Sequence, residues 1–200
     1  PGSSRCNLVY QESLLLSEGA VGVGTAKMIR LNAPYDIDPS LGSTSVAGFS
    51  EMAALYQSYR VVRAEIRVSF APYGNGIGSV AELSLFPTAT SSVPSNAIAW
   101  PVQRAGVSTT TFQASGATAS ERVPELRLRV DIPKFLGLSK TQWLTDHQYA
   151  AATTTIPNKL VFAAVCLRGG GATSTTPANA TATVRVAMDV QFFDPVVLSN

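Results

Sequence analysis

The run from Arg60 to Phe70 limits the possible folds more than any other stretch of the sequence. Its apolar side chains recur at every second position: Val62, Ala64, Ile66, Val68 and Phe70. Arginine, glutamate and serine occupy most of the positions between them. A two-residue period is typical of a half-buried strand, because successive side chains leave opposite faces of the backbone. The chain is therefore expected to build a sheet with one face against a core.

Further alternating or apolar runs recur along the 200 residues. Candidate strands are 7–16, 21–31, 60–70, 79–86, 107–112, 126–132, 143–155, 159–167 and 183–193. Apolar residues at helical spacing from Phe49 to Tyr56 predict one short helix, and 94–100 is a second candidate. No helix between strands is long enough for a parallel crossover. We therefore predict an all-β fold over one domain, 1–200: an eight-stranded antiparallel jelly-roll β-sandwich with one or two short helices in the loops.

Composition narrows the function classes. Charged residues make up 14% of the chain and the formal net charge is +2, too little by itself to form an electrostatic footprint for nucleic acid. Such low charge suits a chain that hides part of its surface against partners. Two cysteines, Cys6 and Cys166, are too few for a disulfide framework and are expected to be free thiols. No apolar run has the roughly 18 residues that a membrane span needs.

The sequence carries no recognisable catalytic motif. His147 is the single histidine, beside Asp146 and a few residues after Ser139. A serine–histidine–aspartate site needs three groups that converge in space, and no Gly-x-Ser-x-Gly elbow supports one. We interpret His147 as a surface residue and expect no enzymatic activity.

The turn from Leu31 to Pro39 holds the main candidate site residues: Asn32, Pro34, Tyr35, Asp36 and Asp38. Two carboxylates in one turn are able to contribute oxygens to calcium, especially at a subunit interface. The preferred interpretation is that they organise the turn through backbone N–H groups, because calcium coordination is not completed locally. We predict no cofactor, and calcium between subunits remains the alternative.

Arginines form a second candidate set. Arg60, Arg63 and Arg67 are expected on the outward face of one strand, and Arg127 and Arg129 on that of another. The preferred interpretation is a solvated or ion-paired face. The alternative is a surface that contacts another subunit or nucleic acid, which requires the arginines to cluster.

Three segments together resemble a known family. Leu31-Asn32-Ala33-Pro34-Tyr35-Asp36, then 49–59, then 59–66 are similar to the turn, helix and strand in the shell domain of small icosahedral virus capsid proteins of the tombusvirus-like kind. The capsid protein of hepatitis E virus-like viruses is similar around Tyr59 to Ala64. The resemblance implies a single jelly roll, two four-stranded sheets and a symmetric homo-oligomeric shell.

The resemblance also implies a function and partners. The chain is expected to be a structural capsid protein of the virion that self-assembles in the host cell around a nucleic-acid genome. It implies that the genome is bound through a basic arm, which this chain does not contain, and that a host receptor is a further partner. The alternative is a monomeric carbohydrate- or receptor-binding β-sandwich, with its site in the Ser/Thr-rich loops at 91–120 and 169–179.

Overall fold

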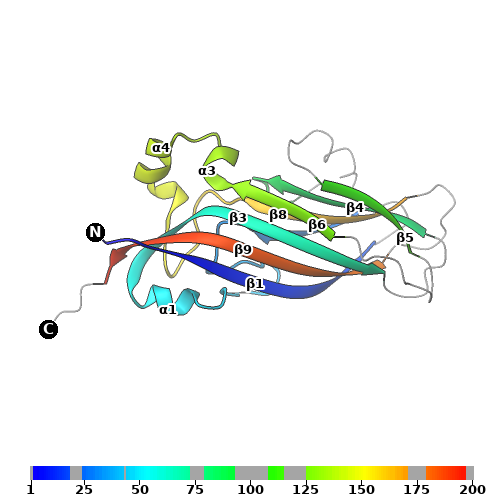
Figure 1. The fold of residues 1–200 in the computed structure, drawn as a ribbon, viewed down its shortest axis with the longest axis horizontal. Helices are drawn as coiled ribbons and strands as arrows, with labels where there is room; N and C mark the ends of the chain where they lie inside the picture. Colours follow the sequence, from blue (N-terminus) through cyan, green and yellow to red (C-terminus); the bar gives the residue numbers. More distant parts are fainter. Residues whose placement is uncertain are drawn as a thin grey trace.

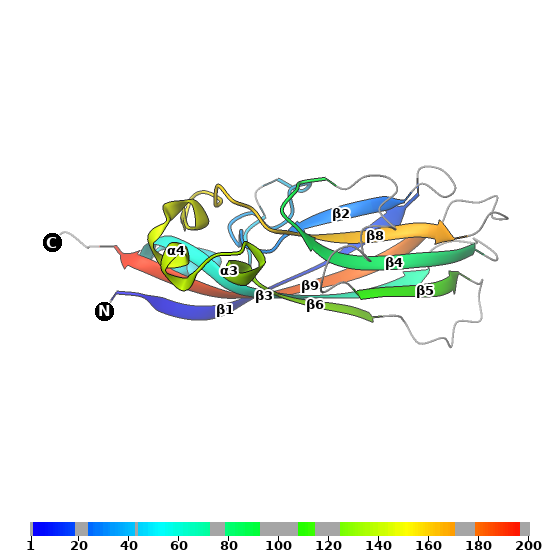
Figure 2. The ribbon, with the colours of Figure 1, turned by 90° about the horizontal axis from the view of Figure 1, so that it is seen from above.

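Two antiparallel sheets pack face to face in the computed structural model, which describes residues 2–18, 24–42, 44–72, 79–92, 108–114, 125–170 and 179–196. The five-stranded sheet has the order β1 (Ser4–Ser17), β9 (Asn179–Pro195), β3 (Tyr56–Pro72) and β6 (Glu125–Asp131), with the short β7 (Ala151–Ala152) beside β3. The four-stranded sheet has the order β2 (Thr25–Arg30), β8 (Phe162–Gly170), β4 (Ser79–Thr88) and β5 (Ser108–Ala114). Figure 2 shows the two layers from the side.

The chain changes sheet at most of its connections, so strands far apart in sequence become neighbours. β1 pairs with β9 along its whole length, and β3 lies between β9 and β6 (Figure 1). Two sheets joined in this way form a jelly roll. The predicted all-β jelly-roll sandwich is confirmed.

The core lies between the sheets and follows the predicted alternation. The inward side chains of β9 are all fully buried: Val184, Val186, Met188, Val190 and Phe192. The alternation in β3 holds from Ala64 to Phe70 and fails at Val62. The pairing of β3 with β9 shifts register between Val61 and Arg63, so Val61 takes the inward position and Val62 is only half-buried. A β-bulge of this kind adds one residue and reverses the face of those before it.

Short helices occupy connections near the end of the sandwich that carries both termini (Figure 1). They are α1 (Phe49–Ala53), α3 (Ile132–Phe135), α4 (Lys140–Thr145) and the 3-10 helix η1 (His147–Tyr149). Helix α1 is shorter than predicted, because β3 already begins at Tyr56. In the part of the chain that the structure describes, no helix has the length and apolarity to cross a membrane.

The predicted strand at 143–155 is wrong. Its first half is α4 and η1, and only Ala151 and Ala152 pair as a strand. The local cause is a capping box, in which the Ser139 hydroxyl accepts from the Gln142 N–H and the Gln142 side chain accepts from the Ser139 N–H. This reciprocal pair stabilises a helix start. The helix candidate at 94–100 lies outside the described residues.

Candidate assembly and nucleic-acid surfaces

Asn32 ties the turn after β2 to the segment that enters β8. Its buried side chain donates from Nδ2 to the carbonyl oxygen of Lys159 over 2.8 Å and accepts from the N–H of Val161 over 2.9 Å. The Val161 N–H would otherwise lack a partner at a buried position, whereas Lys159 is exposed. An asparagine suits this place because its amide offers a donor and an acceptor together.

Pro34 and Tyr35 connect the same turn to α1. The carbonyl oxygen of the buried Pro34 accepts from the Val46 N–H over 2.8 Å, shortly before the helix begins. The Tyr35 ring centroid lies 6.2 Å from that of Phe49, the first residue of α1. Phe49 is itself buried against Tyr59 of β3 with edge-to-face rings 5.1 Å apart. The turn is therefore linked to β3 through Phe49, the first residue of α1.

Asp36 and Asp38 each form an ion pair with a basic residue of β2. Asp36 pairs with Arg30, and the fully buried Asp38 lies 2.6 Å from the Lys27 ammonium. Asp38 also accepts from the N–H and hydroxyl of Ser40, both over 2.8 Å. Burial acts to raise the pKa of Asp38, but the hydrogen bonds from Lys27 and Ser40 hold it below its ordinary value.

A third acid, Glu12 of β1, lies close to Asp38. The Tyr10 hydroxyl donates to Glu12 over 2.9 Å. Burial raises the pKa of the Glu12 carboxyl, and the neighbouring charge of Asp38 adds to this. Within the described ranges, no three acidic, histidine or cysteine side chains are arranged to hold a metal ion. The acids of this region are thus organised by Lys27, Arg30 and local hydrogen bonds.

Arg60 is separated from the other arginines of β3. It is buried, and its Nη1 donates to the carbonyl oxygens of Trp143 and Leu144 over 2.9 and 3.0 Å. Its guanidinium lies 4.3 Å from the centre of the Phe193 ring. Burial lowers the pKa of Arg60. A cation at the last carbonyls of a helix is favourable, so Arg60 anchors α4 to β3.

Four other arginines meet on the outer face of the five-stranded sheet. Arg67 lies opposite Arg127 of β6 on one side and opposite Arg185 of β9 on the other, while Arg129 lies opposite Glu65. We call these four arginines and Glu65 the arginine patch. Like charges directly opposite one another destabilise a sheet, so the row of three arginines has an energetic cost.

Glu65 offsets part of this repulsion. Its carboxylate accepts from Arg67 over 2.9 Å, from Arg127 over 2.8 Å and from Arg129 over 2.7 Å. These arginines, Arg127 first, lower the pKa of Glu65 to about 2. The carboxylate is therefore charged at neutral pH. Four arginines and one glutamate leave the patch a net charge of three positive.

Every member of the arginine patch except Arg185 lines a shallow hollow of about 400 Å³. Asn7, Arg63 and Ala187 also line it, together with Asp189, whose carboxylate accepts two hydrogen bonds from Arg5. In the described part of the chain neither Arg63 nor Arg185 has an ion-pair partner. Guanidinium groups are planar donors suited to phosphate oxygens. The arrangement is thus able to hold an extended polyanion across three strands.

The sequence interpretation found this patch only in part. The alternation places Arg67, Arg127 and Arg129 on outward faces, but it does not reveal that β3 pairs with β6. Arg185 was missed, although it alternates with the inward residues Val184 and Val186, which is a usable signal.

The residues around His147 serve the local backbone. His147 is exposed at the start of η1. Asp146 accepts from the N–H and side-chain amide of Gln148, and Ser139 caps α4. These hydrogen bonds lower the pKa of Asp146. Asp146 and Ser139 thus each cap a helix, and this role explains their presence.

Comparisons with known proteins bear on the fold. No protein-family model matches the chain, and a search among curated proteins also found no match. Among solved structures, Mud crab tombus-like virus aligns over 98% of this chain and 92% of its own, with 10% identity and a TM-score of 0.53. The nodavirus of the giant freshwater prawn Macrobrachium rosenbergii aligns over 98% of both chains, with 11% identity and a TM-score of 0.49.

Cocksfoot mottle virus aligns over 96% of this chain and 97% of its own, with 14% identity and a TM-score of 0.48. At such identities the likeness concerns the fold, and of these three the Mud crab tombus-like virus chain is similar enough to support a conclusion. The chain therefore has the fold seen in the structure of Mud crab tombus-like virus, in agreement with the resemblance of its turn, helix and strand to small icosahedral virus shells.

Proposed function

We propose that this chain is a structural capsid protein, one jelly-roll shell domain over residues 1–200, that self-assembles into an icosahedral shell enclosing a nucleic-acid genome. The observation that carries the proposal is the fold: two sheets in jelly-roll order that align over nearly the full length of a virus structure. Assembly rather than catalysis is the proposed activity, and the virion is the proposed location.

A rigid sandwich suits this role. Each copy contributes several modest contacts, and closed symmetry combines them so that weak interfaces give a stable particle. The turn at Asn32 to Asp38 is proposed to fix α1 against β3, because Tyr35 contacts Phe49 of α1 and Phe49 in turn packs on Tyr59 of β3. The loops at that end of the sandwich would then keep a constant shape for contacts between copies.

The arginine patch is proposed as the surface that faces the genome. Its net charge of three positive is displayed on a flat sheet face, and the patch keeps a row of like charges at an energetic cost. Phosphate contacts of this kind are independent of sequence and depend strongly on salt. In the shell, the outer face of the five-stranded sheet would thus be the interior surface.

Electron microscopy and light scattering on the purified chain test the proposal. We expect closed particles of uniform size, formed more readily when a single-stranded nucleic acid is added, over a range of pH and calcium concentrations. A chain that stays monomeric at high concentration under all these conditions would contradict the proposal. Specific sugar binding by such a monomer on a glycan array would favour the carbohydrate-binding alternative.

A further inference from the structure

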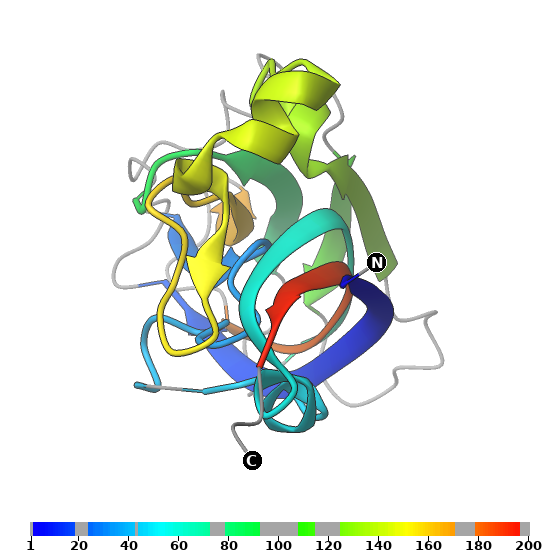
Figure 3. The ribbon, with the colours of Figure 1, turned by 90° about the vertical axis from the view of Figure 1, so that its left-hand side faces the viewer.

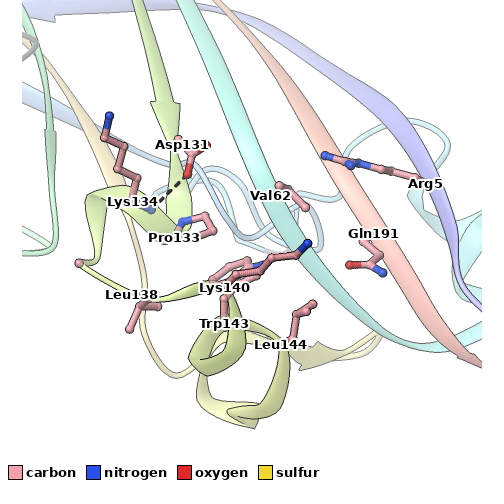
Figure 4. A pocket seen from close by; sticks show the side chains of 11 residues that line it. Arg5, Val62, Asp131, Pro133, Lys134, Leu138, Lys140, Trp143, Leu144 and Gln191 are labelled. Atoms are coloured by element: carbon pink, nitrogen blue, oxygen red, sulfur yellow. Dashed lines mark hydrogen bonds between the residues drawn. The ribbon is translucent and has the colours of Figure 1, made fainter.

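A groove of about 580 Å³ lies between the α3–α4 segment and outward-facing residues of the five-stranded sheet (Figure 4). Its apolar lining comes from Val62, Pro133, Leu138, Trp143 and Leu144. Val62 reaches the groove because of the β-bulge, and Arg60 holds α4 beside it. The bulge and Arg60 thus help to place Val62 and α4 beside the groove.

Basic side chains border this groove: Arg5, Lys134 and Lys140. Arg5 already binds Asp189 through two hydrogen bonds of 2.6 Å. Within the described ranges, Lys134 and Lys140 have no ion-pair partner. The acid in the lining, Asp131, accepts from the Lys134 N–H as the cap of α3. The groove is therefore suited to an apolar surface that carries negative charge.

The same molecule exposes such a surface at the end of α1. Leu55 is 60% exposed and Val196 is 38% exposed, and the Val196 N–H donates to the Leu55 carbonyl oxygen over 2.9 Å. Two exposed acids, Glu51 and Asp194, flank this pair in sequence, and in the described part of the chain neither forms an ion pair. The charge of Asp194 also acts on Arg60, whose pKa it raises in opposition to burial. We call these four residues the acidic knob.

The knob and the groove lie on opposite sides of the same end of the sandwich. Helix α1 is at the bottom of Figures 1 and 3 and α4 is at the top, with β3 and β9 between them. The knob therefore cannot enter the groove of its own chain. A contact between unlike surfaces of two copies is heterologous, and repeating it closes a ring when the rotation allows.

We propose that the acidic knob of one copy docks into the groove of a second copy, with Leu55 and Val196 on the apolar lining and the acids beside Lys134 and Lys140. This inference rests on the proposed function and names one contact of the shell. The occupant is a second copy because this chain itself supplies the charge and the apolar side chains that the groove requires.

Charge reversal tests the contact. Lys140→Glu and Glu51→Lys are each expected to weaken association by about tenfold, because each places like charges together. The double variant restores association, since every copy supplies both surfaces. Lys140 begins α4, where an acid is favourable, so the helix is retained. Lys159→Glu, an exposed lysine before β8, is the matched control and leaves association unchanged. Sedimentation velocity measures all four variants.

Disulfide trapping gives a second readout. In a Cys6→Ser background, Leu55→Cys with Leu144→Cys is expected to cross-link copies into dimers and higher species under oxidation. Leu55→Cys with Leu15→Cys, equally exposed on β1, is the control and gives little cross-linking. Equal cross-linking in the two cysteine pairs would overturn the docking, and so would association that does not change with the charge reversals. Neither result would contradict shell assembly. If the chain forms small rings that the charge reversals weaken and restore as expected, but no closed particles, the docking is supported and the shell is contradicted. A parent chain that stays monomeric contradicts both proposals.

Discussion

Replacing Glu65 by glutamine is expected to weaken the fold and to strengthen polyanion binding at the same time. Glu65 is the acid of the arginine patch and accepts hydrogen bonds from Arg67, Arg127 and Arg129. The substitution keeps the size of the side chain and removes its charge. The net charge of the patch then rises from three to four positive.

The binding effect follows from counterion release. We take each unit of net charge on the patch to neutralise one phosphate of a single-stranded nucleic acid. A plot of the logarithm of the binding constant against the logarithm of the salt concentration then has a slope of about −2.1 for the parent and about −2.8 for Glu65→Gln. At a salt concentration near 0.1 M, the added contact corresponds to about fivefold tighter binding.

The stability effect has the opposite sign. The Glu65 side chain is only 16% exposed but its partners are largely exposed, so we expect a loss of about 1 kcal/mol at low salt. Folding lowers the pKa of the Glu65 carboxyl from about 4.3 to about 2. Such a group stabilises the fold fully at pH values above its unfolded pKa of about 4.3. The stability difference between parent and variant is therefore present at neutral pH and is lost as pH falls through about 2.

Fluorescence anisotropy with a labelled single strand, over a series of salt concentrations, measures binding, and urea unfolding measures stability. Glu51→Gln makes the same charge change on α1 and serves as the control. Binding is measured at protein concentrations too low for association, because Glu51 also belongs to the acidic knob. Unchanged or weaker binding by Glu65→Gln, or an equal gain in Glu51→Gln, would refute the assignment of the patch as the binding surface.

Three further substitutions test the turn and the α4 anchor. Asn32→Ala leaves the buried Val161 N–H and the Lys159 carbonyl without their side-chain partner, so urea unfolding should show a loss of about 1–3 kcal/mol. Arg60→Met removes the cation from the last carbonyls of α4. Hydrogen exchange in α4 should then accelerate by about tenfold, equivalent to about 1.4 kcal/mol, and unchanged exchange rates would contradict the role of Arg60 as an anchor. Pro34→Gly should loosen α1 and impair particle formation before it abolishes folding, and normal particles in electron microscopy would show that the turn does not have this role.

The alternation of side chains made much of the fold predictable. It assigned the inward residues of β3, β6 and β9, because the direction of a strand side chain depends only on local backbone geometry. It failed where local geometry changes. The bulge beside Val62 reverses the expected direction of that side chain, and the capping box at Ser139 starts a helix where a strand was expected. Ser139 and Gln142 have the spacing of a capping box, so this helix start is recognisable in the sequence.

The candidate site was less predictable than the fold. The sequence singled out Asp36 and Asp38 without revealing their partners in β2, and it grouped Arg60 with arginines that the structure places elsewhere. Partners of this kind depend on loop paths and packing, which local patterns do not encode.

The sequence by itself determined that this chain forms sheets around one apolar core, and which residues of each long strand face that core. The tertiary structure alone decided that β3 lies between β9 and β6, which brings Arg185, Arg67 and Arg127 into one row. Strand pairing joins residues that are 60 positions apart for Arg67 and Arg127 and 118 apart for Arg67 and Arg185. Its free energy depends on the whole set of packed strands. For that reason the arginine patch and the α3–α4 groove exist only in the folded chain.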